Sequence, residues 1–227
     1  MSKKRKKRRK VKGKGKPTPP RRVEVPNHII AAYADEAPEV FVKKFRQDCC
    51  INATRVLLDV FRHFDMKARP LSVECAVHNK MLVDFIAAHN GVMPAEEVVD
   101  EWYEKGAWGV RIEGEVVTKD RGWAGHLVGI VQDRWLVDSS SGQMSRPEKG
   151  IHLPPILVAP ATRLFLKARE RCILNGPEGA VILYGAKLDD KSYETASGFQ
   201  RHDFNREVAA EIIARMSKRL GRSLDNS

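Results

Sequence analysis

The chain has 227 residues, of which 42% are hydrophobic and 30% are charged. This size and composition fit one ordinary globular domain with a full hydrophobic core. No apolar run approaches the roughly 18 residues needed to span a bilayer. The basic N-terminus is not followed by the apolar stretch of a signal peptide. We therefore expect a cytoplasmic protein with no membrane association.

The positive charge is confined to one end of the chain. Lys and Arg number 40 against 29 Asp and Glu, which gives a net charge of +11. Residues 1–22 hold thirteen of the basic side chains and no acid, which leaves 27 basic against 29 acidic side chains in residues 23–227. These counts predict a disordered basic tail over residues 1–22 and a single α+β domain over residues 23–227.

Residues 49–64 have the apolar spacing of an amphipathic helix. One face comprises Cys50, Ala53, Thr54, Leu57, Phe61 and Phe64, and the opposite, polar face comprises Asn52, Arg55, Asp59, Arg62 and His63. Asp48 is a suitable N-cap and would make Cys50 the second residue of the helix. We expect a shorter helix, over residues 35–45, before it.

The remaining elements follow from the same reading of apolar spacing. In chain order we expect a strand over residues 67–78, helices over 80–89 and 94–104, a hairpin over 125–138 that turns at Gln132 to Arg134, a strand over 179–187 and a final helix over 204–220. Helices come first and hairpin-connected strands follow. This order favours an α+β fold in which N-terminal helices pack on an antiparallel sheet.

The four cysteines are Cys49, Cys50, Cys75 and Cys172. In a protein that is not secreted we expect them to be free thiols. No CxxC pair occurs, so we expect no structural metal site.

Cys50 is the cysteine best placed for chemistry. A thiol attacks as a thiolate, which the unpaired N–H groups and the dipole at a helix N-terminus stabilise. Cys50 lies at the centre of the apolar face, whereas Cys49 lies at its boundary, so Cys50 faces the rest of the fold. The alternative is that Cys50 is a small buried apolar residue, which is a common fate of a free cysteine.

The predicted hairpin adds a histidine and an acid. His126 begins its first strand and Asp138 ends its second, and the two lie symmetrically about Gln132. Residues so placed are cross-strand neighbours to within one register step. An imidazole held by a carboxylate completes a nucleophile–base–acid triad. Taken singly, His126 could instead be a strand-end residue and Asp138 a turn residue.

The order of a cysteine at a helix start, a histidine on a strand and an acid on the next strand resembles the papain-like superfamily. It is most similar to the transglutaminase-like and arylamine N-acetyltransferase-like branch. The matching segments are DCCINATR around Cys50, GHLVGIV with His126 and RWLVDSSSGQ with Asp138. Together with the run from Arg146 to Pro155, they are also similar to uncharacterised bacterial and phage proteins. Ile51 stands where papain-type enzymes have a tryptophan, so the subfamily stays open.

The resemblance implies a thiol acyl-transfer enzyme that hydrolyses an amide or ester, or moves an acyl group to an amine. Cys50 would attack the carbonyl, His126 would carry the proton and Asp138 would hold His126. The backbone N–H of Cys50 and the side chain of Gln47 are candidate oxyanion donors, with Gln143 a weaker one. The substrate would be a peptide, an amide or an acyl-bearing small molecule, and no cofactor is implied.

A second hypothesis belongs to another class of function. The domain could be an inactive papain-like scaffold whose tail binds nucleic acid or another polyanion, with an affinity that falls steeply with salt. The densest run of the tail comprises Lys3, Lys4, Arg5, Lys6, Lys7, Arg8, Arg9 and Lys10.

Overall fold

The computed structural model describes residues 27–45, 49–112, 123–200 and 202–221. Within these ranges the α-helices are α1 (His28–Lys44), α2 (Cys50–His63), α3 (Lys80–Ala88), α4 (Glu96–Glu104) and α5 (Asp203–Arg219). The strands are β1 (Ala68–His78), β2 (Gly109–Ile112), β3 (His126–Val131), β4 (Trp135–Asp138), β5 (Leu157–Pro160), β6 (Cys172–Asn175) and β7 (Val181–Ala186). The chain therefore has a mixed α+β fold, as expected. The predicted basic tail and Gln47 lie outside the described residues.

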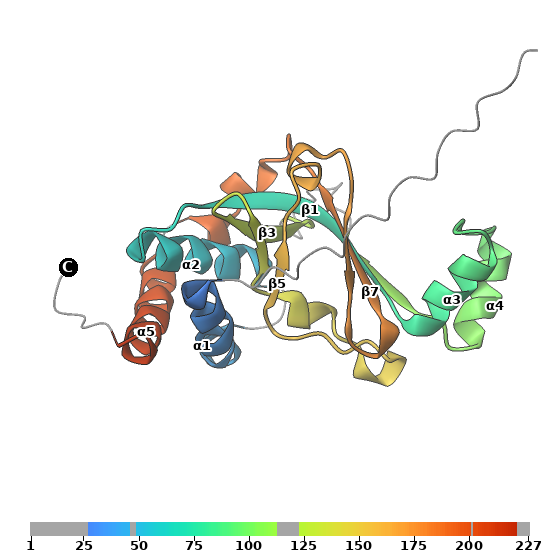
Figure 1. Ribbon diagram of the computed structural model, residues 1–227, viewed down its shortest axis with the longest axis horizontal. Helices are drawn as coiled ribbons and strands as arrows, with labels where there is room; N and C mark the ends of the chain where they lie inside the picture. Colours follow the sequence, from blue (N-terminus) through green and yellow to red (C-terminus); the bar gives the residue numbers. More distant parts are fainter. Residues whose placement is uncertain (1–26, 46–48, 113–122, 201, 222–227) are drawn as a thin grey trace, which may run out of the picture.

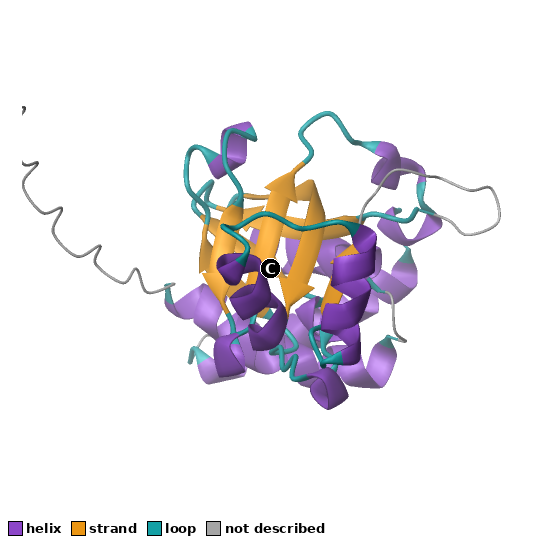
Figure 2. Cartoon of the chain, turned by 90° about the vertical axis from the view of Figure 1, so that its right-hand side faces the viewer, coloured by secondary structure: helices purple, strands orange, loops and turns teal. Residues whose placement is uncertain are grey.

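The strands form one antiparallel sheet that curves until it is nearly closed (Figures 1 and 2). Its order is β5-β4-β3-β1-β7-β6, and β2 pairs with the far part of β1. The long β1 pairs with β3, β7 and β2, so it is the element that joins the halves of the sheet. Helices α3 and α4 lie at the end of β1 and β2, away from the other helices (Figure 1).

The two faces of the sheet have separate cores. On the outer face, α1, α2 and α5 pack together and against side chains such as Val131 and Val137. The opposite face is filled by apolar side chains of the curved strands themselves, including Val73, Val128, Leu136 and Tyr184. Alternate residues of each strand therefore enter different cores, which explains why every residue of β3 and β4 is buried.

Helix α2 approaches β3 closely because Gly129 has no side chain. A Cβ atom built on Gly129 would lie 2.6 Å from Leu57 Cδ2, closer than packed carbon atoms allow. Two residues before Gly129, the Leu127 carbonyl accepts a hydrogen bond of 2.9 Å from the buried hydroxyl of Thr54. These two contacts fix the position of α2 against β3.

Two details of the predicted α2 are wrong. The helix begins at Cys50 with Cys49 as its N-cap, so Cys50 is the first helical residue, and the Cys49 side chain makes no capping hydrogen bond. Asp59, which we assigned to the polar face, is buried. It forms ion pairs with Arg55 at 2.8 Å and with Arg62 at 3.3 Å, as a buried charge requires.

Helix α1 begins at His28, seven residues before the predicted start. Asn27 caps it by accepting a hydrogen bond of 3.0 Å from the backbone N–H of Ile30. Pro38, inside the helix, did not prevent it from forming. Strands β2, β5 and β6 were not predicted, because each is only four residues long and, unlike β4, belongs to no predicted hairpin. No helix in the described ranges is both long and apolar enough to cross a membrane.

We expect the substitution Gly129→Ala to destabilise the fold, because the added methyl group would push α2 away from β3. The free energy of unfolding should fall by about 1–3 kcal/mol, which is the usual cost of overpacking. Urea denaturation measures this loss. The double variant Leu57→Ala, Gly129→Ala is the control: its loss should be smaller than the sum of the losses of the two single variants. Additive losses would show that the contact does not set the distance.

Candidate functional site

The structure brings Cys50, His126 and Asp138 together from the ends of three elements. Cys50 is the first residue of α2, His126 the first of β3 and Asp138 the last of β4. The β3–β4 register, which includes Gly129 opposite Val137, continues to place Asp138 opposite Val128. His126 and Asp138 are therefore diagonal neighbours on one face, and His126 Nε2 lies 2.7 Å from Asp138 Oδ2.

Asp138 is fully buried and is the acceptor of a network of hydrogen bonds. Its Oδ2 also accepts a bond of 2.8 Å from the Tyr184 hydroxyl, and its Oδ1 accepts bonds from the N–H and the hydroxyl of Ser140 at 3.0 and 3.2 Å. Burial alone would raise the pKa of Asp138, but His126 and these donors hold it below its usual value. The carboxylate is therefore ionised at neutral pH.

His126 is also fully buried, which by itself would lower its pKa. The negative charge and the hydrogen bond of Asp138 act in the opposite sense, and hydrogen bonding to the Cys50 side chain adds to them. The net result is a pKa of about 10. At neutral pH the imidazole is therefore protonated, as one half of a buried ion pair.

The Cys50 thiol lies at the N-terminal end of α2, beside the imidazole. Its sulfur is 3.8 Å from the carbonyl oxygen of Gly125, the residue before His126. Only 8% of Cys50 is exposed, and its neighbours include Leu127 and Tyr193.

Gln143 contacts the ring nitrogen that Asp138 leaves free. It belongs to the 3₁₀ helix η1 (Ser141–Met144), and its side-chain nitrogen lies 3.0 Å from His126 Nδ1. The other end of the amide, Oε1, is buried and makes no hydrogen bond to a described residue. A neutral ring would accept from the amide nitrogen, whereas a protonated ring needs an acceptor. Rotation of the amide would place Oε1 toward Nδ1, which would satisfy both groups.

The other cysteines have different surroundings. Cys75 is buried inside the sheet with its sulfur 3.3 Å from that of Met144, and burial raises its pKa far above the usual range. Burial also raises the pKa of Cys172, to about 11. Cys49 is half-buried against the helical core. All four cysteines are free thiols, as predicted.

Sequence reasoning missed two of the groups that hold Asp138. The Ser140 contact had a signal, because an Asp followed two residues later by a donor N–H is a common turn pattern. Tyr184 had none: it lies in β7, 46 residues beyond Asp138, and only the curvature of the sheet brings the two side chains together. Of the two glutamines considered, Gln143 contacts His126, and Gln47 lies outside the described residues.

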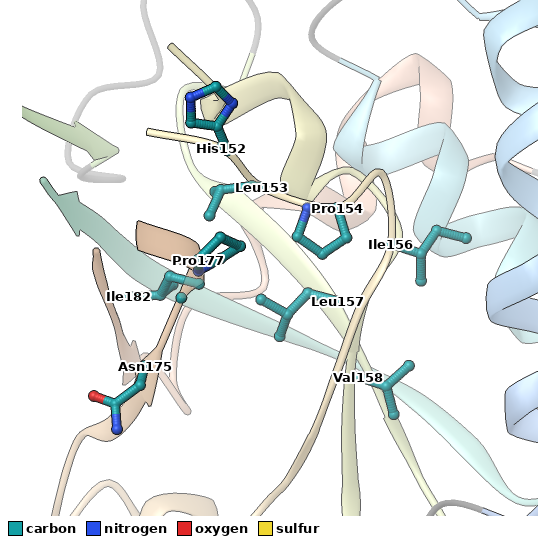
Figure 3. A pocket seen from close by; sticks show the side chains of 10 residues that line it. His152, Leu153, Pro154, Ile156, Leu157, Val158, Asn175, Pro177 and Ile182 are labelled. Carbon is teal, nitrogen blue, oxygen red and sulfur yellow. The ribbon is translucent and has the colours of Figure 1, made fainter. Parts of the chain in front are cut away.

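A separate pocket of about 550 Å³ lies between β5 and the β6–β7 hairpin (Figure 3). Apolar side chains such as Leu153, Leu157 and Ile182 line it. Its one titratable lining residue, His152, is exposed and pairs with Glu178 at 3.4 Å. This pocket therefore lacks reactive groups like those that lie around Cys50.

No family model matches the chain, and neither a curated protein nor a solved structure matches it significantly. The described residues contain no group of three or more His, Cys, Asp or Glu side chains that could hold a metal ion.

The raised pKa of His126 predicts a pH-dependent stability. The folded chain holds this proton more tightly than the unfolded chain, in which a histidine titrates near ~6.5. The stabilisation is therefore complete below that pH and is lost as the pH rises through about 10. We expect the free energy of unfolding to fall more steeply between pH 7 and pH 10 in the wild type than in His126→Gln. Urea denaturation at a series of pH values measures both curves, and parallel curves would contradict the prediction.

Proposed function

We propose that this protein is a thiol acyl-transfer enzyme in which Cys50 is the nucleophile, His126 the proton carrier and Asp138 the residue that orients His126. The observation that carries the proposal is the buried His126–Asp138 pair at 2.7 Å, placed beside a thiol at the first residue of a helix. A purely structural role would require either the buried ion pair or the cysteine at the helix start, but not both. Their convergence from distant parts of the chain is characteristic of covalent catalysis.

The first half of the reaction forms a thioester. The reaction starts from the Cys50 thiolate and the His126 imidazolium, in which the proton given up by the thiol is on Nδ1 because Nε2 is held by Asp138. The sulfur then attacks the substrate carbonyl, and the C=O electron pair moves onto oxygen. As the tetrahedral intermediate collapses, the bond to the leaving amine or alcohol breaks and Nδ1–H supplies its proton. The products of this half are the acyl-enzyme and the free leaving group.

The second half releases the acyl group. Water, or an acceptor amine, gives a proton to Nδ1 and attacks the thioester carbonyl. The C–S bond then breaks, and the sulfur leaves as the thiolate beside the imidazolium. All protons and electron pairs come from the three side chains, the substrate and the acceptor. The chemistry proposed here therefore assigns no step to a cofactor.

The negative charge that develops on the carbonyl oxygen needs donors. The backbone N–H of Cys50 is suitable because, as the first N–H of α2, it has no acceptor within the helix. Asp138 contributes indirectly. It holds the ring through Nε2, which leaves Nδ1 to exchange the proton, and it keeps the imidazolium stable in a dry environment.

The order Cys50, His126, Asp138, on a helix followed by two antiparallel strands, is also the order in papain-like enzymes of the transglutaminase-like branch. We include membership of that group in the proposal. Either hydrolysis or transfer is compatible with the side chains, and the acceptor that reaches the thioester decides between them.

The proposal predicts that His126 makes Cys50 the most reactive thiol. At pH 7 iodoacetamide should alkylate Cys50 faster than the other cysteines, and His126→Ala should slow this reaction at least about tenfold. Alkylation of Cys49 should change little. Peptide mass spectrometry measures each thiol separately across a pH series.

Asp138→Asn provides a graded comparison, because it removes the charge that stabilises the imidazolium but leaves a side chain of the same shape. Circular dichroism should establish that both variants are folded. If Cys50 reacted as an ordinary free thiol in the wild type and in both variants, the proposal that the protein is an enzyme would be wrong. A dependence on His126 at Cys49 alone would contradict the assignment of the nucleophile.

A further inference from the structure

A second cavity, of about 340 Å³, opens beside the Cys50 centre. One wall is formed by α1, with Pro38, Phe41 and Val42 among its side chains. The opposite wall is formed by the segment that follows β4, which contributes Gln143 and Arg146.

Three contacts connect this cavity to the proposed reaction centre. Cys49, the neighbour of Cys50, lines it. Gln143 also lines it, and its amide contacts His126 Nδ1. Ser140, a third lining residue, donates two hydrogen bonds to Asp138. A molecule in the cavity would therefore lie next to the groups that carry out the chemistry.

The α1 wall is apolar and partly open to solvent. The rings of Phe41 and Phe45 stack with their centroids 5.2 Å apart, and both residues line the cavity. Val42, also on this wall, is 78% exposed, which is unusual for a large apolar residue in the described part of the chain. This wall offers apolar area that a ligand could cover.

The opposite wall carries a positive charge. Nη1 of Arg146 donates to the carbonyl oxygens of Gln143 and Ser145 at 2.9 and 2.6 Å, which fixes the guanidinium group in place. None of the ion pairs between described residues involves Arg146, and it is half-buried. The remaining N–H groups of the guanidinium are suited to a ligand carboxylate.

We propose that this cavity binds the leaving half of the substrate and that the substrate is an N-acyl derivative of an apolar amino acid. The apolar side chain would lie against Phe41 and Val42, and the free carboxylate would pair with Arg146. The acyl carbonyl would then be directed toward Cys50. The inference rests on the proposed function of the Cys50 centre.

The test uses electrophilic probes that vary one feature at a time. N-chloroacetyl-phenylalanine has the apolar group and the carboxylate, N-chloroacetyl-glycine lacks the apolar group, and the methyl ester of the first lacks the charge. Each rate of Cys50 alkylation is divided by the rate with glutathione. We expect the first probe to exceed each of the others by about tenfold. Equal normalised rates for the three probes would overturn the proposal.

Two variants test the walls separately. Val42→Asp changes an exposed residue, so it should leave folding intact, yet it should cost N-chloroacetyl-phenylalanine most of its advantage. Val42→Thr is the matched control, with nearly the same shape and no charge. Arg146→Gln should abolish the difference between the acid and its methyl ester. An unchanged preference in both Val42→Asp and Arg146→Gln would contradict the assignment of the walls.

A binding measurement separates failure of the cavity from failure of the chemistry. N-acetyl-phenylalanine is not an electrophile and can be titrated into the full-length Cys50→Ser variant. Shifts of the backbone amide resonances of Val42 and Gly142 would support the cavity even if Cys50 proved unreactive. No shift at millimolar concentration would overturn it, whatever the reactivity of Cys50.

Discussion

The structure around Cys50 depends on one interaction, the hydrogen bond between His126 and Asp138 in the dry interior. Removing two charges from water is costly, by several kcal/mol for each ion, and attraction between them offsets this cost only if their remaining hydrogen bonds are made. Asp138 meets that condition through Tyr184 and Ser140. Loss of any one partner would leave a buried charge incompletely satisfied. We infer that this requirement fixes the position of β4, β7 and the turn after Asp138 relative to one another.

Much of the fold could be predicted, because its longer elements carry strong local signals. The amphipathic pattern of α2 and the paired apolar runs of β3 and β4 each span enough residues to define their period. The burial of Asp59 could not be predicted, because the helical period of α2 places this residue on the polar face. The short strands β5 and β6 form only because β4 and β7 supply their hydrogen-bonding partners.

In the site, too, residues with a local sequence signal could be predicted, whereas contacts with distant segments could not. Cys50, His126 and Asp138 could be selected because each stands at the end of a predicted element. The diagonal register of the hairpin could not be fixed, since it is set by the turn geometry at Gln132 and Asp133, both of which have positive φ. Tyr184 was missed because the sheet must curve before its hydroxyl can reach Asp138. The cavity beside Cys50 was not predicted, because its walls come from α1 and η1 and no sequence pattern links these two segments.

Asp138 keeps His126 protonated beside the Cys50 sulfur. The ¹⁵N chemical shifts of the two His126 ring nitrogens report this state directly. In a titration from pH 5 to pH 11, the structure predicts that both nitrogens carry a proton at pH 7 and that the ring loses one near pH 10. In Asp138→Asn the ring should titrate at a lower pH. A wild-type ring that is neutral at pH 7, or that titrates equally in the variant, would contradict the account.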